Sequence, residues 1–209
     1  MPICPLCNSN SKAFYKDEFY KCSCCDGIFR PKQNLLTNEK EKERYESHTN
    51  DSDDLGYQNF VSPITNSVLK EFNKEDIGLD FGCGKDSPIV KILRNNEYTI
   101  FEYDPYFFDD KKALEQKYDY IACCEVIEHF YNPKKEFELL KKLLKDNGTL
   151  YLMTGIYRDN IDFSTWWYKN DLTHVFIFQE KTFEWIKKEL GFVDLEIQKN
   201  FIRLLIKKD

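Results

Sequence analysis

The chain has 209 residues, of which 32% are charged and 42% are hydrophobic, and its formal net charge at pH 7 is −6. This length is enough to bury the core of one domain with a small appendage. No apolar run approaches the roughly 18 residues that a membrane-spanning helix needs, and the first residues lack the basic and apolar regions of a signal peptide. We therefore expect a cytoplasmic protein without a membrane partner. The acidic, interleaved charge argues against nucleic acid as the default partner.

Two pairs of cysteines near the N-terminus predict a zinc site. Cys4 and Cys7 form one Cys-x2-Cys knuckle, and Cys22 and Cys25 form a second, with Cys24 left over. This spacing lets four thiolates converge on one zinc ion. Disulfides are the alternative, but the expected reducing compartment disfavours them. We predict a zinc ribbon over residues 1–33 in which the metal supplies folding energy, with a strand-like stretch at 14–21 and a returning strand at 27–30.

A polar segment follows the ribbon. Residues 34–58 include Glu39-Lys40-Glu41-Lys42-Glu43-Arg44, whose mixed charge is typical of a solvated helix or linker. The segment is a linker or a lid, and in the second case Tyr45 and His48 would fold over a pocket. We place the domain boundary here, with the main domain at 59–209.

Helical and strand-like segments alternate from residue 63 onward, which indicates a parallel sheet covered by helices on both faces. The predicted fold class is α/β, a Rossmann-like doubly wound sheet. The last two strands are too close in sequence for a parallel crossover, so we expect a C-terminal antiparallel hairpin at the sheet edge. The predicted helices are 63–73, 87–96, 133–145 and 180–190, and the predicted strands are 77–82, 98–103, 119–124, 148–154, 192–199 and 201–208.

The ends of the first two strands of this domain carry ligand-binding signals. The first ends in Leu79-Asp80-Phe81-Gly82-Cys83-Gly84, and glycines at a strand-to-helix turn let backbone amides approach a ligand. The second ends at Asp104, about 20 residues later, where a carboxylate can accept hydrogen bonds from both hydroxyls of a ribose. No third glycine follows Gly84, so a pyrophosphate-binding loop is not supported.

Together with Tyr118-Asp119-Tyr120-Ile121 and the following Glu125-Val126-Ile127-Glu128-His129, these residues resemble class I S-adenosylmethionine-dependent methyltransferases. The resemblance runs from about residue 60 to the end, and an N-terminal zinc ribbon occurs among bacterial members. It implies a methyltransferase domain over 59–209 with S-adenosylmethionine as cofactor. The cofactor-binding residues that it implies are Asp80, Gly82, Gly84 and Asp104.

One departure from this family concerns the third strand. Only residues 105–118 separate Asp104 from Asp119, whereas a further strand with its helices needs roughly 30 residues. We therefore expect the third strand to be missing. The aromatic run Tyr106-Phe107-Phe108 then either contacts adenine or covers the exposed sheet edge.

A second cluster predicts the chemistry. Glu125, Glu128 and His129 follow strand 119–124, and on a helical turn they would share one face. His174 lies in the long connection 156–179, and such mixed ligands suit a Mg or Mn ion. The set resembles the metal site of small-RNA 3′-end 2′-O-methyltransferases and ubiquinone-pathway O-methyltransferases. This resemblance implies a divalent site of Glu125, Glu128, His129 and His174, with Glu128, His129 and His174 as catalytic residues. The alternative is local hydrogen bonding by His129.

The long connection also carries Trp166-Trp167-Tyr168, which we interpret as a wall of the acceptor site; packing against the ribbon is the alternative. Cys83, Cys123 and Cys124 lie in apolar runs and are expected to be inert core residues.

These signals predict an enzyme that methylates an oxygen of a small molecule, with structural zinc and a possible Mg or Mn ion. The first alternative is an RNA 2′-O-methyltransferase that uses the ribbon as a clamp; it requires a contiguous basic surface that the charge order does not indicate. The second alternative is a non-catalytic zinc-binding adaptor with a degenerate methyltransferase domain. The intact Gly82, Gly84 and Asp104 argue against the adaptor. The sequence does not predict the acceptor or the oligomeric state.

Overall fold

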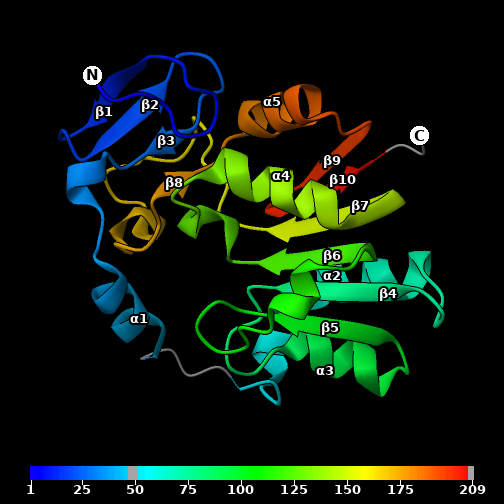
Figure 1. Cartoon of the computed structure of the whole chain (residues 1–209). Coiled ribbons are helices and arrows are strands. Elements are labelled where there is room, and N and C mark those ends of the chain that lie inside the picture. The colour runs from blue at the N-terminus through cyan, green and yellow to red at the C-terminus, as the bar shows by residue number, and fades with distance from the viewer. Residues whose placement is uncertain (47–50, 207–209) are drawn as a thin grey trace.

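The computed structural model describes residues 1–46 and 51–206. A six-stranded sheet forms the centre of the molecule, and a smaller four-stranded sheet lies near one end of it (Figure 1). His48 lies outside the described residues, so its predicted place over the pocket stays a prediction. No helix of the described part is long and apolar enough to cross a membrane.

The large sheet has the strand order β5-β4-β6-β7-β10-β9. Its first four strands are parallel, and β10 runs antiparallel to both β7 and β9. The predicted C-terminal hairpin at the sheet edge is therefore confirmed. The strands are β4 (Ile77–Phe81), β5 (Thr99–Tyr103), β6 (Tyr118–Cys124), β7 (Leu144–Met153), β9 (Asp194–Gln198) and β10 (Phe201–Leu205).

The third strand of the doubly wound pattern is missing, as predicted. Within residues 1–46 and 51–206, no strand pairs with the outer edge of β5. Residues 105–117 instead form a short connection that includes a 3-10 turn at Lys111–Leu114. A single bridge between Asp104 and Phe108 folds the start of this connection back onto the end of β5.

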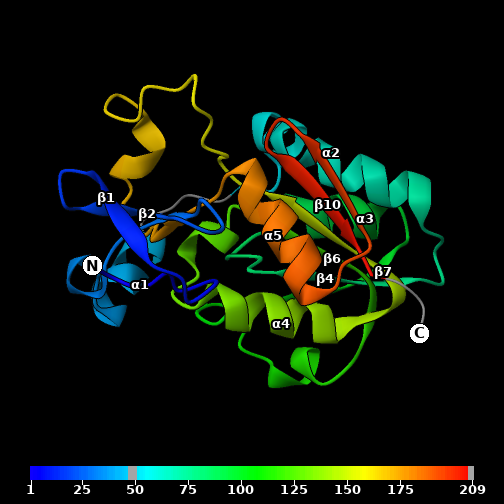
Figure 2. The same ribbon diagram turned by 90° about the horizontal axis from the view of Figure 1, so that it is seen from above.

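Helices cover both faces of the large sheet. Figure 2 shows α2 (Leu55–Glu71) and α3 (Pro88–Asn95) on one face, and α4 (Pro133–Leu143) and α5 (Glu180–Leu190) on the other. Each pair buries an apolar stripe against the strands, for example Ile64 of α2 and Phe137 of α4. The two cores pack against opposite faces of the strands and so set where the loops that follow the strands begin.

Helix α2 begins at Leu55 rather than at the predicted residue 63. Asp54 caps this helix, because its carboxylate accepts a hydrogen bond from the Tyr57 amide at 2.7 Å. Pro63 therefore lies inside the helix, although it lacks an amide hydrogen and usually marks a helix start. Buried Val61 and Ile64 on either side of it show that tertiary packing outweighs this local penalty.

The first three strands of the smaller sheet belong to the predicted ribbon. Its strands are β1 (Ser11–Tyr15), β2 (Phe19–Cys22) and β3 (Ile28–Phe29), so the stretch predicted as one strand over 14–21 is instead a hairpin. Lys16 and Asp17 form its turn with φ angles of 46° and 53°, the left-handed values that tight hairpin turns require. The fourth strand is β8 (Phe176–Ile177), which comes from the long connection after β7 and pairs antiparallel with β3.

Helix α1 (Asn38–Glu46) connects the ribbon to the main domain and lies near the carboxyl ends of the parallel strands (Figure 1). This position lets its side chains reach the loops that follow those strands. The predicted division into residues 1–33, 34–58 and 59–209 stays a prediction.

Candidate active site and cysteine cluster

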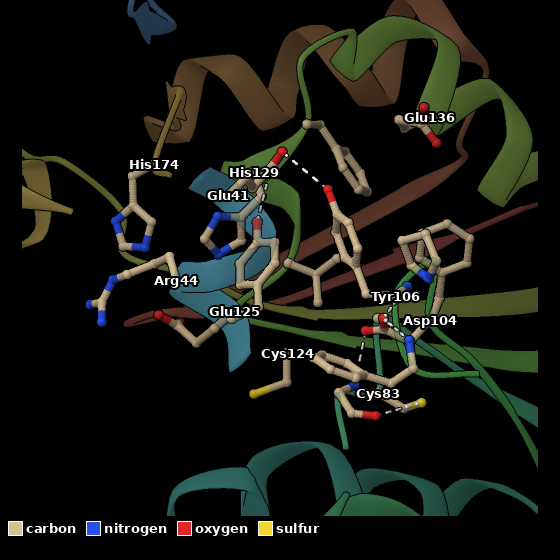
Figure 3. A pocket seen from close by; sticks show the side chains of 18 of the residues that line it. Glu41, Arg44, Cys83, Asp104, Tyr106, Cys124, Glu125, His129, Glu136 and His174 are labelled. Atoms are coloured by element: carbon tan, nitrogen blue, oxygen red, sulfur yellow. Dashed lines mark hydrogen bonds between the residues drawn. The ribbon is translucent and has the colours of Figure 1, made fainter. Parts of the chain in front are cut away.

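A cavity of about 780 Å³ opens at the carboxyl ends of the parallel strands, where doubly wound folds bind ligands. The glycine turn after β4 and the loop after β5 line one part of it, and the loop after β6 lines another. Figure 3 shows Asp104 and Tyr106 on one side, and Glu125, His129 and His174 on the other. The predicted cofactor half and the predicted chemistry half therefore face a common space.

The glycine turn is tight because its backbone requires it. Gly82 and Gly84 have φ angles of 80° and 66°, and a Cβ at Gly82 would lie 2.5 Å from a methyl group of Val126. The amide of Gly82 donates to the carbonyl of Tyr103 at 2.7 Å. The amides of this turn already have acceptors in the protein, so the turn lets a ligand approach the backbone closely rather than bind to free amides.

Asp104 lies at the end of β5 and is 8% exposed. Its Oδ2 accepts from the Gly84 amide at 3.1 Å, and its Oδ1 accepts from the amides of Tyr106 and Phe107 at 2.8 and 3.1 Å. A carboxylate offers about four acceptor positions, so one remains for a ligand hydroxyl. The residue both lines the pocket and ties the glycine turn to the loop after β5.

Asp80 lies beneath the turn, is 2% exposed, and is outside the pocket lining. It accepts a hydrogen bond of 2.5 Å from the hydroxyl of Ser87, the residue that caps α3. Burial raises the pKa of Asp80 to about 7. Asp80 thus joins the end of β4 to the start of α3, on either side of the glycine turn.

Glu128 is fully buried on the 3-10 turn Ile127–His129. Its carboxylate accepts from the hydroxyl of Tyr168 at 2.5 Å and from the hydroxyl of Thr154 at 2.9 Å. The Gly155 amide donates to the same Tyr168 oxygen at 3.0 Å. These bonds fix the carboxylate in one orientation, as the outer partners of a metal ligand do.

The two histidines are held in matching ways. Nδ1 of His129 lies 2.9 Å from the carbonyl oxygen of Thr173, and Nδ1 of His174 lies 2.7 Å from that of Tyr168. A carbonyl only accepts, so each Nδ1 carries a proton, and in the neutral form each ring presents its lone pair at Nε2. Burial lowers the pKa of His174, which favours its neutral form. One ligand atom from each of Glu128, His129 and His174 lies within 4.8 Å of the others.

Glu125 does not contribute a ligand atom to this group of three, although its side chain interacts with Glu128 and Tyr168. Its φ angle is 52°, so the chain turns sharply at this residue and the predicted common helical face does not form. The side chain still lines the pocket. Burial and the charge of Glu128 raise the pKa of Glu125 to about 9, which keeps its carboxyl protonated at neutral pH.

Helix α1 contributes a residue that sequence reasoning missed. Glu41 is 5% exposed and lines the pocket, and it accepts from the hydroxyls of Tyr45 and Tyr106 at 2.9 and 3.2 Å. On the same helix, Arg44 pairs with Asp171 at 2.8 Å. No sequence signal distinguishes Glu41 from the charged residues beside it, because its burial depends on contact with distant residues such as Tyr106.

The aromatic run in the long connection divides between both predicted roles. Trp166 packs against Tyr157 and Phe163, whose cluster includes Phe19 of the ribbon. Trp167 is 69% exposed and lines the pocket. Tyr168 is buried against Glu128, as described above.

The remaining cysteines match the expected inert role in part. Burial raises the pKa values of Cys83, Cys123 and Cys124, which disfavours reactive thiolates. Cys83 and Cys124 nevertheless line the pocket, so they belong to its wall as well as to the core.

The four predicted zinc ligands converge. One sulfur from each of Cys4, Cys7, Cys22 and Cys25 lies within 4.8 Å of the others, with Cys4–Cys25 and Cys7–Cys22 separations of 3.7 and 3.3 Å. Zinc–sulfur bonds of about 2.3 Å in a tetrahedron place sulfurs about 3.8 Å apart, so the cluster fits a zinc ribbon. All four are free cysteines, and Cys24 is exposed and donates from its amide to Cys22 Sγ.

A Rossmann-like sheet without its third strand, with a pocket at the strand ends, defines a cofactor-binding α/β enzyme fold. A family model described as a methyltransferase domain matches residues 55–197. The chain therefore belongs to this methyltransferase family, and the resemblance to class I S-adenosylmethionine-dependent methyltransferases is confirmed for family and fold.

Solved structures share this fold at low sequence identity. The chain is similar to an O-methyltransferase family protein from Burkholderia thailandensis (11% identity, TM-score 0.55, 81% of this chain and 63% of that chain). It is also similar to human N-acetylserotonin methyltransferase in complex with S-adenosylmethionine (13%, 0.54, 82% and 57%). A third match comes from the complex between the Haloferax volcanii Trm112 methyltransferase activator and a putative methyltransferase (11%, 0.56, 83% and 100%). The chain thus spans about three fifths of the first two proteins. A comparison with curated protein sequences finds no match.

Proposed function

We propose that the protein is an S-adenosylmethionine-dependent methyltransferase that methylates an oxygen of a small molecule with the help of a divalent ion. The observation that carries this proposal is the shared pocket. The glycine turn and Asp104 line one side of it, and His129 and His174, grouped with buried Glu128, lie at the other. A methyl donor and an acceptor bound in these two halves would meet between them.

The cofactor would bind with its ribose at Asp104 and its methionine part along Gly82 and Gly84. When bound, the cofactor would supply a methyl group to an acceptor oxygen: the oxygen–carbon bond would form as the carbon–sulfur bond breaks, its electron pair would stay on the sulfur of S-adenosylhomocysteine, and the acceptor proton would pass to solvent. Tyr106 and Phe107 would contact adenine, and their position in the pocket lining beside Asp104 supports this role.

Glu128, His129 and His174 are the residues that would hold the ion. One carboxylate and two neutral imidazoles suit Mn or Mg with water or acceptor oxygens at the open positions. When bound, the ion would lower the pKa of the acceptor hydroxyl. Thr154, Tyr168 and the backbone carbonyls at the two Nδ1 atoms support this proposal, since they orient all three ligands.

The test is methyl transfer from labelled S-adenosylmethionine to a panel of catechols and vicinal diols, with short RNAs as a second panel. We expect turnover on the small molecules that requires Mn or Mg and falls at least about 100-fold in His174→Ala, the loss typical of a removed catalytic group. Turnover that survives metal removal and His174→Ala would contradict metal assistance, with His129 then acting as a general base. Transfer to RNA alone would favour the RNA methyltransferase.

We further propose that Cys4, Cys7, Cys22 and Cys25 hold one structural zinc ion. Elemental analysis of protein purified without added metal should find about one zinc per chain. Cys7→Ser should lose it and unfold the first 30 residues, whereas Cys24→Ser should retain it, because metal binding supplies the folding energy of so small a unit. Zinc-free protein with an ordered N-terminus would refute the assignment.

A further inference from the structure

Arg30 is a buried cation at the junction between the ribbon and the active site. It follows β3 directly, and the residue is 7% exposed. Among the ion pairs of the described residues, none includes the Arg30 guanidinium. The guanidinium carbon instead lies 4.2 Å from the ring centre of Phe19, and the guanidinium N–H groups donate to backbone carbonyls. A buried charge is costly unless its donors are satisfied, so these contacts must be maintained in the folded protein.

The carbonyls that Arg30 binds belong to the segment that carries two site residues. Nη2 donates to the Lys169 carbonyl at 2.7 Å, and Nε donates to the His174 carbonyl at 3.3 Å. The Arg30 amide donates to the Val175 carbonyl at 2.9 Å. One ribbon residue therefore joins both ends of the loop from Lys169 to Val175.

Tyr168, which precedes this loop, and Val175, at its end, both contact Glu128. Tyr168 donates to the Glu128 carboxylate, and its carbonyl lies 2.7 Å from Nδ1 of His174. The Val175 amide donates to the Glu128 carbonyl at 2.9 Å, and β8 then pairs with β3. A contact path thus runs from the ribbon through Arg30 to Tyr168, His174 and Glu128.

We propose that Arg30 is a positioning residue through which the ribbon holds Tyr168 and His174 in the active site. The catalytic role of Tyr168 and His174 rests on the proposed function, whereas the positioning of their segment by Arg30 rests on the contacts above. The planar guanidinium suits the task because its donors diverge toward two carbonyls at once. A lysine ammonium keeps the charge over Phe19 but lacks that fixed fork.

The experiment compares Arg30→Met and Arg30→Lys with Arg158→Met in the full-length zinc-loaded protein. Arg158 is the control, because it also donates to a backbone carbonyl, that of Lys199, and its ion pair is with Glu180 rather than with a residue of the loop from Lys169 to Val175. Hydrogen–deuterium exchange is measured over residues 168–178 and over the ribbon. Mn affinity is measured by the paramagnetic signal of unbound Mn, and S-adenosylmethionine affinity by calorimetry.

We expect Arg30→Met to raise exchange in 168–178 at least tenfold and to weaken Mn binding at least tenfold, while cofactor affinity changes less than twofold. Arg30→Lys should show the same pattern with a smaller amplitude, and Arg158→Met should resemble the wild type. Unchanged exchange in 168–178 would overturn the proposal. The proposal would also be overturned if both Arg30 variants lost protection from exchange equally in the ribbon and in 168–178. Arg30 would then stabilise the ribbon as a whole rather than position the loop.

The exchange result separates this inference from the proposed function. If the wild type binds neither Mn nor S-adenosylmethionine, the proposed function fails. The exchange of 168–178 still decides whether Arg30 positions the loop.

Discussion

At the scale of single residues, the site is built from side chains whose polar atoms are already oriented by protein groups. Glu128 is held by Tyr168 and Thr154, and each histidine is held through Nδ1 by a carbonyl. Glu125 differs, because its nearest charged neighbour is another carboxylate and its pKa is raised to about 9. A protonated Glu125 can donate a hydrogen bond, whereas a charged one would repel Glu128.

This raised pKa predicts how stability depends on pH. In the unfolded chain the pKa of Glu125 is about 4.3. Between that pH and about 9, the folded state therefore binds more protons than the unfolded state. Stability should therefore fall as pH rises through this window. Glu125→Gln mimics the protonated form. The free energy of unfolding of this variant should therefore gain on that of the wild type as pH rises, by at most about 1.4 kcal/mol per pH unit.

The measurement is urea unfolding at several pH values in buffer without divalent ions. Glu184→Gln, on the exposed surface of α5, controls for the loss of one charge. A constant difference between Glu125→Gln and wild type from pH 5 to 8 would show that Glu125 titrates normally.

At the scale of elements, helix α1 closes the pocket from outside the sheet. Glu41 contacts Tyr106 of the cofactor-side loop, and Arg44 contacts Asp171 of the long connection. The helix therefore bridges the two halves of the site. Segments that join two parts of a pocket commonly control ligand entry and release.

We predict that Glu41→Ala speeds release of S-adenosylhomocysteine on the order of tenfold, because it removes an acceptor that the hydroxyls of two half-buried tyrosines, Tyr45 and Tyr106, share. Stopped-flow fluorescence of the pocket tryptophan Trp167 can follow the release. Glu43→Ala changes an exposed residue of the same helix and should leave the rate unchanged. Equal release rates in both variants would mean that α1 does not act as a lid.

At the scale of the whole molecule, local sequence signals predicted most of the main domain. Alternating patterns located its helices and strands, and the short interval after Asp104 predicted the missing strand. Local signals were insufficient where long-range contacts decide the structure. Pro63 suggested a helix start that the packing of α2 overrides, and β8 is a two-residue strand that exists only because β3 pairs with it.

The candidate site divides in the same way. Glycines at a turn and an acid at a strand end are recognisable from spacing, and so are the four ribbon cysteines. The structure also groups Glu128, His129 and His174, although the left-handed turn at Glu125 separates that residue from them. Glu41 and Arg30 were not predicted as site residues, because nothing in their neighbourhoods indicates which distant carbonyls and tyrosines surround them.

The most direct test of the central claim is calorimetric titration of the full-length protein with S-adenosylmethionine and S-adenosylhomocysteine. Both should bind at one site per chain. Asp104→Ala should weaken both by roughly 1.5–3 kcal/mol, the contribution of a hydrogen bond to a charged group, whereas Asp109→Ala should not. Asp109 is the fitting control, since it is half exposed and outside the pocket lining. Absence of binding by both compounds to the wild-type protein would contradict the methyltransferase assignment of this site.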